Sequence, residues 1–312
     1  MSLLSYLEIP SILIEVDPGI DDALALMVLF AAWKLNLINI LAIICSNGNT
    51  NLTQTCENTK KIMDANHITE NDIPLFSGVA TGVVNETPID LWFGEDGFGD
   101  IKPPIESKPR SVLPGYNLAS YLKKNKNYDE ISYLSLGSLT FLMTFLLQQP
   151  EVNFKDIWIM GGNNLGSNHQ EWNFFVDPEA VHFILRQSEK IPLILLMFES
   201  CESVQPTLGW RRNVLGEINT EIVDLINKAE AFKLEGIPDD HIWYQYDPVL
   251  AVAFVYPDAI TSLKEISVNI TLGNDPNTRS VLVEGDFKVK FVESLFLERY
   301  KTILEESAKV LT

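Results

Sequence analysis

Three aspartates stand close together near the start of the chain. Asp17, Asp21 and Asp22 fall within six residues, in the run DPGIDD, where a loop is expected to enter a helix. Neighbouring carboxylates repel one another, and a bound divalent cation relieves that repulsion. A site of carboxylate and carbonyl oxygens suits calcium or magnesium rather than zinc. The spacing also fits a purely structural role, because acidic residues in a first turn favour the positive end of a helix.

A fourth acid, Asp247, precedes Pro248 at the head of a second apolar segment. Asp is a preferred N-cap residue, so helix capping alone explains its position. On this residue alone, a structural cap and a further oxygen ligand both remain open.

The segments around these acids alternate between strands and helices. Ile12 to Val16 is typical of a buried strand that ends at Asp17-Pro18-Gly19, and Ala23 to Trp33 of an apolar helix lying on a sheet. The alternation continues with strands at 38–46, 131–136, 157–160 and 193–198, and with helices at 52–65, 139–148 and 178–186. This pattern predicts an α/β fold with a mainly parallel central sheet and helices on both faces. The polar clusters follow strands, so the site is expected at the carboxyl ends of the strands.

Less regular segments separate and follow these units. Residues 77–115 are rich in Gly and Pro and are expected to form a long functional loop region. Helices are expected at 217–234 and 248–254, a hairpin at 266–283, and a closing helix from Val289 toward Leu304. We expect one domain over residues 1–312, because α/β folds of this length often form around a single sheet.

Composition limits the partners. The net charge of −19 repels nucleic-acid phosphates and anionic membrane surfaces, so a small substrate is expected and neither a nucleic-acid polymer nor a membrane. The three cysteines, Cys45, Cys56 and Cys201, show no disulfide or zinc spacing. With no signal-peptide pattern at the N-terminus, these features predict a cytoplasmic protein.

The run from Val16 to Leu26, VDPGIDDALAL, resembles the N-terminal signature of the nucleoside hydrolase family. Further motifs of that family are matched in order along residues 12 to 285: Gly48-Asn49, Gly137-Ser138-Leu139-Thr140, Met160-Gly161-Gly162, Glu171-Trp172-Asn173, Asp177-Pro178-Glu179-Ala180 and Tyr246-Asp247. The resemblance implies a nucleoside hydrolase-like open α/β fold. It also implies hydrolysis of ribonucleosides to ribose and free base, in nucleoside catabolism and in purine or pyrimidine salvage.

The resemblance also implies which residues form the site. By motif position, the ligands of a Ca²⁺ ion are Asp17, Asp22, the carbonyl of Thr140 and Asp247. The ribose contacts are Asp21, Asn49, Glu171 and Asn173, and Asp247 is expected to contact substrate as well. A homodimer or homotetramer is implied too.

Cleaving an N-glycosidic bond builds positive charge on the ribose and negative charge on the departing base. Calcium lowers the pKa of a bound water, and Asp17 is placed to take its proton as the general base. Asp21, Asn49 and Glu171 offer partners for ribose hydroxyls, and a site that pairs hydroxyls rejects analogues lacking them. Poor activity on 2′-deoxynucleosides is therefore expected.

Help for the leaving group is where the chain departs from part of the family. Members that prefer inosine and uridine carry two histidines at positions that here are Phe93 and Tyr246, and His67, His169, His182 and His241 lie off the motifs. Members that prefer purine nucleosides stack the base between aromatic rings, a role open to Trp92, Phe93 and Tyr246. Tyr246 is alternatively a proton donor. The family's further ribose-contacting Asn corresponds to Asn164 or Asn168.

Two other function classes are alternatives to the hydrolase. A non-catalytic nucleoside-binding or sensing protein is the alternative that the missing histidines favour, whereas the intact Asp17, Asp21, Asp22 and Asp247 argue against it. A metal-dependent phosphatase needs cations to hold phosphate, and the motifs contain no Lys or Arg.

Overall fold

The computed structural model describes residues 9–82, 89, 91–123, 128–167, 169–273, 275 and 279–310. The strands are β1 (Ser11–Val16), β2 (Asn39–Cys45), β3 (Leu75–Ser77), β4 (Val112–Pro114), β5 (Ile131–Ser135), β6 (Asp156–Met160), β7 (Leu193–Leu196), β8 (Ile260–Ile270), β9 (Leu282–Glu284) and β10 (Phe287–Leu295). The α-helices are α1 (Ile20–Lys34), α2 (Leu52–Ala65), α3 (Leu118–Leu122), α4 (Thr140–Gln148), α5 (Trp172–Val176), α6 (Pro178–Leu185), α7 (Leu208–Asn213), α8 (Glu221–Leu234), α9 (Asp247–Val255) and α10 (Leu297–Val310).

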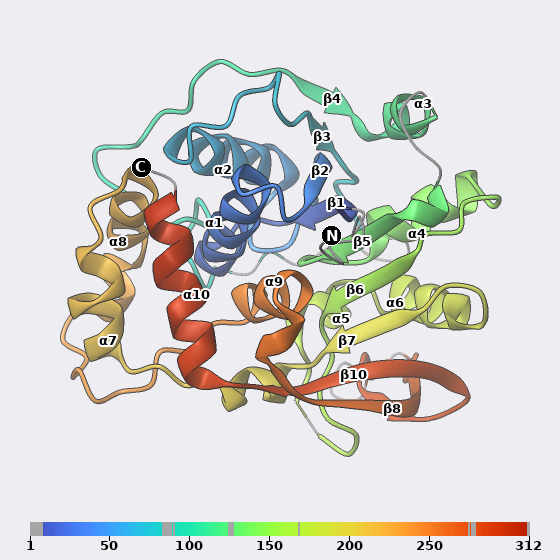
Figure 1. Cartoon of the computed structure of the whole chain (residues 1–312). Coiled ribbons are helices and arrows are strands. Elements are labelled where there is room, and N and C mark those ends of the chain that lie inside the picture. Colours follow the sequence, from blue (N-terminus) through green and yellow to red (C-terminus); the bar gives the residue numbers. More distant parts are fainter. Residues whose placement is uncertain are drawn as a thin grey trace, which may run out of the picture.

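The strands form one sheet in the order β4-β3-β2-β1-β5-β6-β7-β10-β8-β9 (Figure 1). Every neighbouring pair from β4 to β10 is parallel, and β8 and β9 extend the sheet in antiparallel fashion. The chain builds outward from β1 to β4 on one side and from β5 to β7 on the other. A crevice is therefore expected where the carboxyl ends of β1 and β5 meet.

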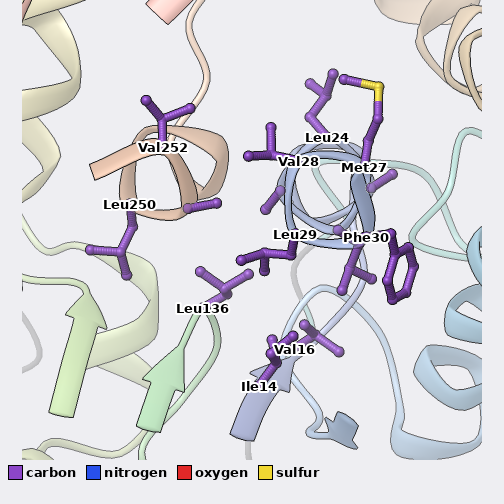
Figure 2. Close-up of a cluster of buried hydrophobic side chains, with 14 of the residues drawn as sticks. Ile14, Val16, Leu24, Met27, Val28, Leu29, Phe30, Leu136, Leu250 and Val252 are labelled. Carbon is purple, nitrogen blue, oxygen red and sulfur yellow. The ribbon is translucent and has the colours of Figure 1, made fainter. Parts of the chain in front are cut away.

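Helices cover both faces of the sheet, as the sequence predicts. On β1, Ile12, Ile14 and Val16 join the apolar core under α1, α9 and α10, while Leu13 joins the core under α4 and α6. Figure 2 shows the first of these cores, where Leu29 of α1 and Leu250 of α9 lie near Leu136. The central strand is thus buried on both faces, which fixes the position of the loop that follows it.

The closing helix expected from Val289 is wrong over its first half. Residues 287–295 form β10, which pairs with β7 and β8 inside the sheet, and the helix begins only at Leu297. The segment FKVKFVESL alternates apolar and polar residues over much of its length, and this period suits a strand. Other expected elements are present within a few residues, and the 77–115 region also contains β4.

Within the described ranges, no helix combines the length and the apolar character that crossing a bilayer requires.

Candidate active site

A cavity of about 340 Å³ opens at the carboxyl ends of the strands. Its walls are Asp17, Asp21, Asn49, Trp92, Phe93, Leu136, Met160, Gln170, Glu171, Trp172, Asn173, Phe198, Tyr246 and Asp247. Nine of these were expected at the site from the sequence alone; Asp22 and Thr140 are buried but are not part of this wall, and Asn168 lies outside the described residues. The volume is within the usual range for a small-molecule site.

Asp17 sits in a cradle that two glycines leave open. A Cβ built on Gly48 would lie 1.8 Å from Asp17 Oδ2, and one on Gly137 would lie 2.8 Å from Oδ1. Asn49 fixes the same residue, because its backbone N–H donates to Oδ2 and its Nδ2 donates to the Asp17 carbonyl, both at 3.0 Å. The glycines of two separate motifs are therefore needed to admit one carboxylate.

The carboxylates of Asp21, Asp22 and Asp247 offer oxygens that all lie within 4.8 Å of one another. Asp22 Oδ2 accepts the Gly19 N–H at 2.9 Å and its Oδ1 accepts the Asp17 N–H at 3.3 Å, which ties the start of α1 to the loop after β1. Asp247 is the first residue of α9. The same acids thus accept N–H groups at a helix start and bring oxygens close enough together to bind one cation. Helix capping and metal binding therefore do not exclude each other.

The electrostatics of the cluster are unfavourable without added positive charge. Burial and the charge of Asp22 raise the pKa of Asp17 well above its usual value, and burial and the charge of Asp21 raise the pKa of Asp22 to about 8. Burial first, then the charges of Asp21 and Asp22, also raise the pKa of Asp247 well above its usual value. In the described part of the cavity wall there is no Lys, Arg or His. A divalent cation fits this oxygen-only donor set and would offset the repulsion among these carboxylates.

Thr140 is buried at the start of α4. Its hydroxyl donates to Asp177 Oδ2 at 2.8 Å, and its carbonyl accepts the Thr144 hydroxyl at 2.8 Å. The expected ligation through this carbonyl stays a prediction.

Glu171 and Asn173 are held rigidly by backbone groups. The carboxylate of Glu171 accepts the N–H groups of Gly162, Asn173 and Phe174 at 2.9, 2.8 and 3.0 Å, as the N-cap of α5. Burial outweighs these bonds and raises the pKa of Glu171 to about 7. Asn173 Nδ2 donates to the carbonyls of Leu136 and Met160 at 2.7 and 3.3 Å, so its Oδ1 is the atom left for a ligand.

Aromatic rings line the remaining wall. Tyr246 stacks on Phe198, with ring centroids 4.8 Å apart and planes 24° apart. Burial raises the pKa of Tyr246, so its hydroxyl keeps its proton at neutral pH. Trp92 is 62 % exposed and carries Lys233 Nζ 3.3 Å from its ring centroid, whereas Phe93 packs against Gly19.

Sequence reasoning did not single out Phe198 or Gln170 as site residues. Phe198 follows β7, and only its place at the carboxyl end of a strand could have signalled it. Gln170 precedes the Glu171 motif and donates through Nε2 to the Arg279 carbonyl at 2.6 Å, a contact that the sequence does not reveal. Asn164, one of two candidates for the further ribose contact, is exposed and is absent from the described wall.

Comparisons with known proteins agree with this geometry. The chain matches the model of the inosine-uridine preferring nucleoside hydrolase family over residues 12–302. It is 26 % identical over 287 residues to an inosine-uridine preferring nucleoside hydrolase of Leishmania major, covering 88 % of this chain and 87 % of that one. It is 27 % identical over 269 residues to the pyrimidine-specific ribonucleoside hydrolase RihA of Escherichia coli K12, covering 81 % and 82 %.

Solved structures show the same fold. An inosine-guanosine nucleoside hydrolase superimposes with a TM-score of 0.80 at 22 % identity, over 96 % of this chain and 98 % of that one. A purine-preferring ribonucleoside hydrolase from Gardnerella vaginalis gives a TM-score of 0.78 at 16 % identity, over 96 % and 98 %. The predicted open α/β fold is thereby confirmed, and the chain belongs to the inosine-uridine preferring nucleoside hydrolase family.

Proposed function

We propose that this ribonucleoside hydrolase uses Ca²⁺ and Asp17 to cleave the N-glycosidic bond, giving ribose and a free base. The observation that supports the proposal most directly is the group of four buried aspartates at the cavity, with no cationic side chain in the described wall. Membership of a hydrolase family gives the reaction class, and the lining of the cavity supports the proposed residue roles.

Asp22 and Asp247 are the proposed central ligands, with Asp17 and the Thr140 carbonyl completing the expected set. The cluster of Asp21, Asp22 and Asp247 supports a site for a hard cation at this place. When bound, the ion supplies a water of lowered pKa and a contact for the ribose hydroxyls. The large size and flexible coordination of Ca²⁺ suit carboxylates that come from two different helices and a loop.

Asp17 is the proposed general base. It lines the cavity, and its carboxylate is held by the Asn49 N–H between two glycines, so it is oriented before substrate arrives. Burial keeps its basicity high relative to an exposed Asp.

Asp21, Asn49, Glu171 and Asn173 are the proposed ribose contacts. Glu171 and Asn173 are already fixed by hydrogen bonds to the backbone, so little ordering is needed when ribose binds. A missing 2′-hydroxyl would leave buried polar groups unpaired, and poor turnover of 2′-deoxynucleosides is therefore part of the proposal.

Purine preference is the proposed base specificity. The Tyr246 ring lies beside the cavity in a stack with Phe198, and Trp92 and Phe93 also line it. A flat aromatic surface favours the larger ring system. The four histidines are absent from the described wall, so base expulsion relies on this stacking or on the Tyr246 hydroxyl.

Assembly, location and domain structure complete the proposal. One sheet runs through all the described strands, which supports a single domain over residues 1–312. The three cysteines are free, as in a reducing cytoplasm. Assembly as a homodimer or homotetramer follows the family resemblance, and sedimentation velocity tests it.

Base release from inosine, adenosine, guanosine, uridine and cytidine tests the reaction. We expect release by the unmodified chain, fastest for the purines, and a loss of at least about a hundredfold in Asp17→Asn. Asp129→Asn is the matched control. Asp129 is exposed and lies just before β5, so it is at the amino-terminal end of that strand, whereas the cavity lies at the carboxyl ends. Equal activity of Asp17→Asn would refute the base assignment. No release of any base by folded chain would replace the hydrolase with a nucleoside-binding protein.

A further inference from the structure

Two cysteines lie on neighbouring elements next to the active-site loops, and neither takes part in the reaction proposed above. Cys45 ends β2, and Cys56 lies in the second turn of α2. Both thiols are free; Cys45 is fully buried and Cys56 is 7 % exposed. Cys45 Sγ lies 3.1 Å from Thr59 Oγ1, which is one helical turn from Cys56 on α2, and both cysteines belong to the same buried core cluster. The packing of β2 against α2 therefore places the Cys45 thiol on the face of α2 that carries Cys56.

The two thiols differ in reactivity. The neighbouring Cys45 thiol, helped by the charge of Lys60, lowers the pKa of Cys56. Burial raises the pKa of Cys45 well above its usual value. A thiolate is the reactive form, so Cys56 is the more nucleophilic and the more accessible of the two.

We propose that Cys45 and Cys56 form a peroxide-sensitive dithiol that closes to a disulfide. The Cys56 thiolate attacks one oxygen of hydrogen peroxide; the O–O bond breaks, hydroxide leaves, and Cys56 becomes a sulfenic acid. The Cys45 sulfur then attacks the sulfur of Cys56, its proton leaves with the displaced hydroxyl as water, and the S–S bond forms. Two thiols lose two electrons in all, and the peroxide is reduced to two waters.

Both cysteines are joined to the catalytic loop by short paths. Cys45 directly precedes Ser46 to Asn49, and Asn49 holds Asp17 through two hydrogen bonds. On the other side, Asn58 of α2 donates through Nδ2 to the carbonyls of Pro18 and Asp96 at 3.3 and 2.8 Å. A covalent S–S bond is shorter than a thiol–thiol contact, so closure moves the end of β2 and the start of α2 together. The loop that carries Asp17 is held between these two elements.

Closure is therefore expected to lower turnover reversibly. A displacement of about 1 Å at a catalytic group costs up to about a hundredfold in rate, and we expect at least about a tenfold loss of kcat/KM. This readout rests on the proposed function, whereas the formation of the disulfide does not.

The experiment treats the reduced full-length chain with hydrogen peroxide and maps its cysteines by mass spectrometry after proteolysis. We expect a Cys45–Cys56 peptide pair lighter by two hydrogen atoms, with Cys201 still a free thiol, and recovery of activity with dithiothreitol. Cys56→Ser is expected to keep its activity in peroxide, and Cys201→Ser, whose thiol is also buried, is expected to respond as the unmodified chain does.

The proposal is overturned if no Cys45–Cys56 link forms, or if Cys201 is oxidised first. A mapped disulfide with unchanged kcat/KM would overturn the coupling to the active site. A chain that releases no base would refute the proposed function alone, because the disulfide is detected without substrate.

Discussion

Among the buried carboxylates, Glu230 and the aspartate cluster have opposite electrostatic surroundings. Glu230 of α8 is 3 % exposed, and Arg211 donates to its Oε2 from Nε at 2.7 Å and forms an ion pair through Nη2 at 2.7 Å. Trp243 Nε1 donates to its Oε1 at 2.8 Å. In the aspartate cluster, Asp22 and Asp247 instead lie beside other carboxylates, and the pKa of each is raised.

The difference separates a structural acid from the acids that we propose take part in the reaction. The positive charge of the Arg211 guanidinium offsets the desolvation of Glu230 inside the protein, so the Glu230 carboxylate has its counter-charge without an added ion. No Lys, Arg or His lines the described wall of the cavity beside the aspartate cluster, and protons or a bound cation would reduce the repulsion among these acids. The contrast predicts that one site governs activity and the other governs stability.

The largest effect is expected when the cluster loses one charge. Asp247→Asn should lower kcat by roughly a hundred- to a thousandfold, because several kcal/mol of metal-assisted stabilisation are lost. Without metal, its thermal unfolding temperature should equal or exceed that of the unmodified chain, since one repulsive charge is removed. Steady-state base release measures kcat, and a thermal melt in chelator measures the unfolding temperature. A variant that stays active but unfolds at a lower temperature would show that Asp247 serves stability rather than activity.

For the ion pair between Arg211 and Glu230, we expect a loss of stability with little change in activity. Glu230→Gln leaves the buried Arg211 guanidinium without a counter-charge and should lower the free energy of unfolding by about 3–5 kcal/mol. Activity per folded molecule should change little, because Glu230 is absent from the described wall of the catalytic cavity. Urea unfolding measures the loss, and unchanged stability would show that the two regions do not differ in this way.

A third expectation concerns pH. Glu15 and Glu171 have pKa values raised to about 7 and Asp22 to about 8, mainly by burial. Between their unfolded values near 4 and these folded values, the native state binds more protons than the unfolded state. Stability of the metal-free chain should therefore fall as pH rises from about 5 to 8. Thermal melts in chelator measure this, and added Ca²⁺ should stabilise more at pH 8 than at pH 5; a greater calcium effect at pH 5 would contradict the account.

The smallest effect is expected at the aromatic wall. Phe198→Ala removes the ring that stacks on Tyr246 and should reduce the purine-to-pyrimidine ratio of kcat/KM by up to about tenfold. Phe296→Ala, at an exposed ring between β10 and α10, is the matched control. An unchanged ratio would show that the stack of Phe198 on Tyr246 does not determine the base preference.

Site residues were easiest to predict from the sequence where they lie on one strand and the loop that follows it. The strand before Asp17, the Pro18-Gly19 break and the acidic start of α1 lie within a single segment. Phe198 and Gln170 were missed because they reach the cavity through contacts between distant segments. The strand at Val289 was missed because its place in the sheet depends on pairing with β7 and β8. The cradle around Asp17 likewise depends on Gly48 and Gly137, which come together only in the folded chain.

The most direct measurement of the central claim is inosine hydrolysis before and after a chelator, followed by added Ca²⁺. Chelation should abolish the release of hypoxanthine, and Ca²⁺ should restore it in the unmodified chain but not in Asp247→Asn. Undiminished release in chelator would contradict the claim that the aspartate cluster works by holding a cation.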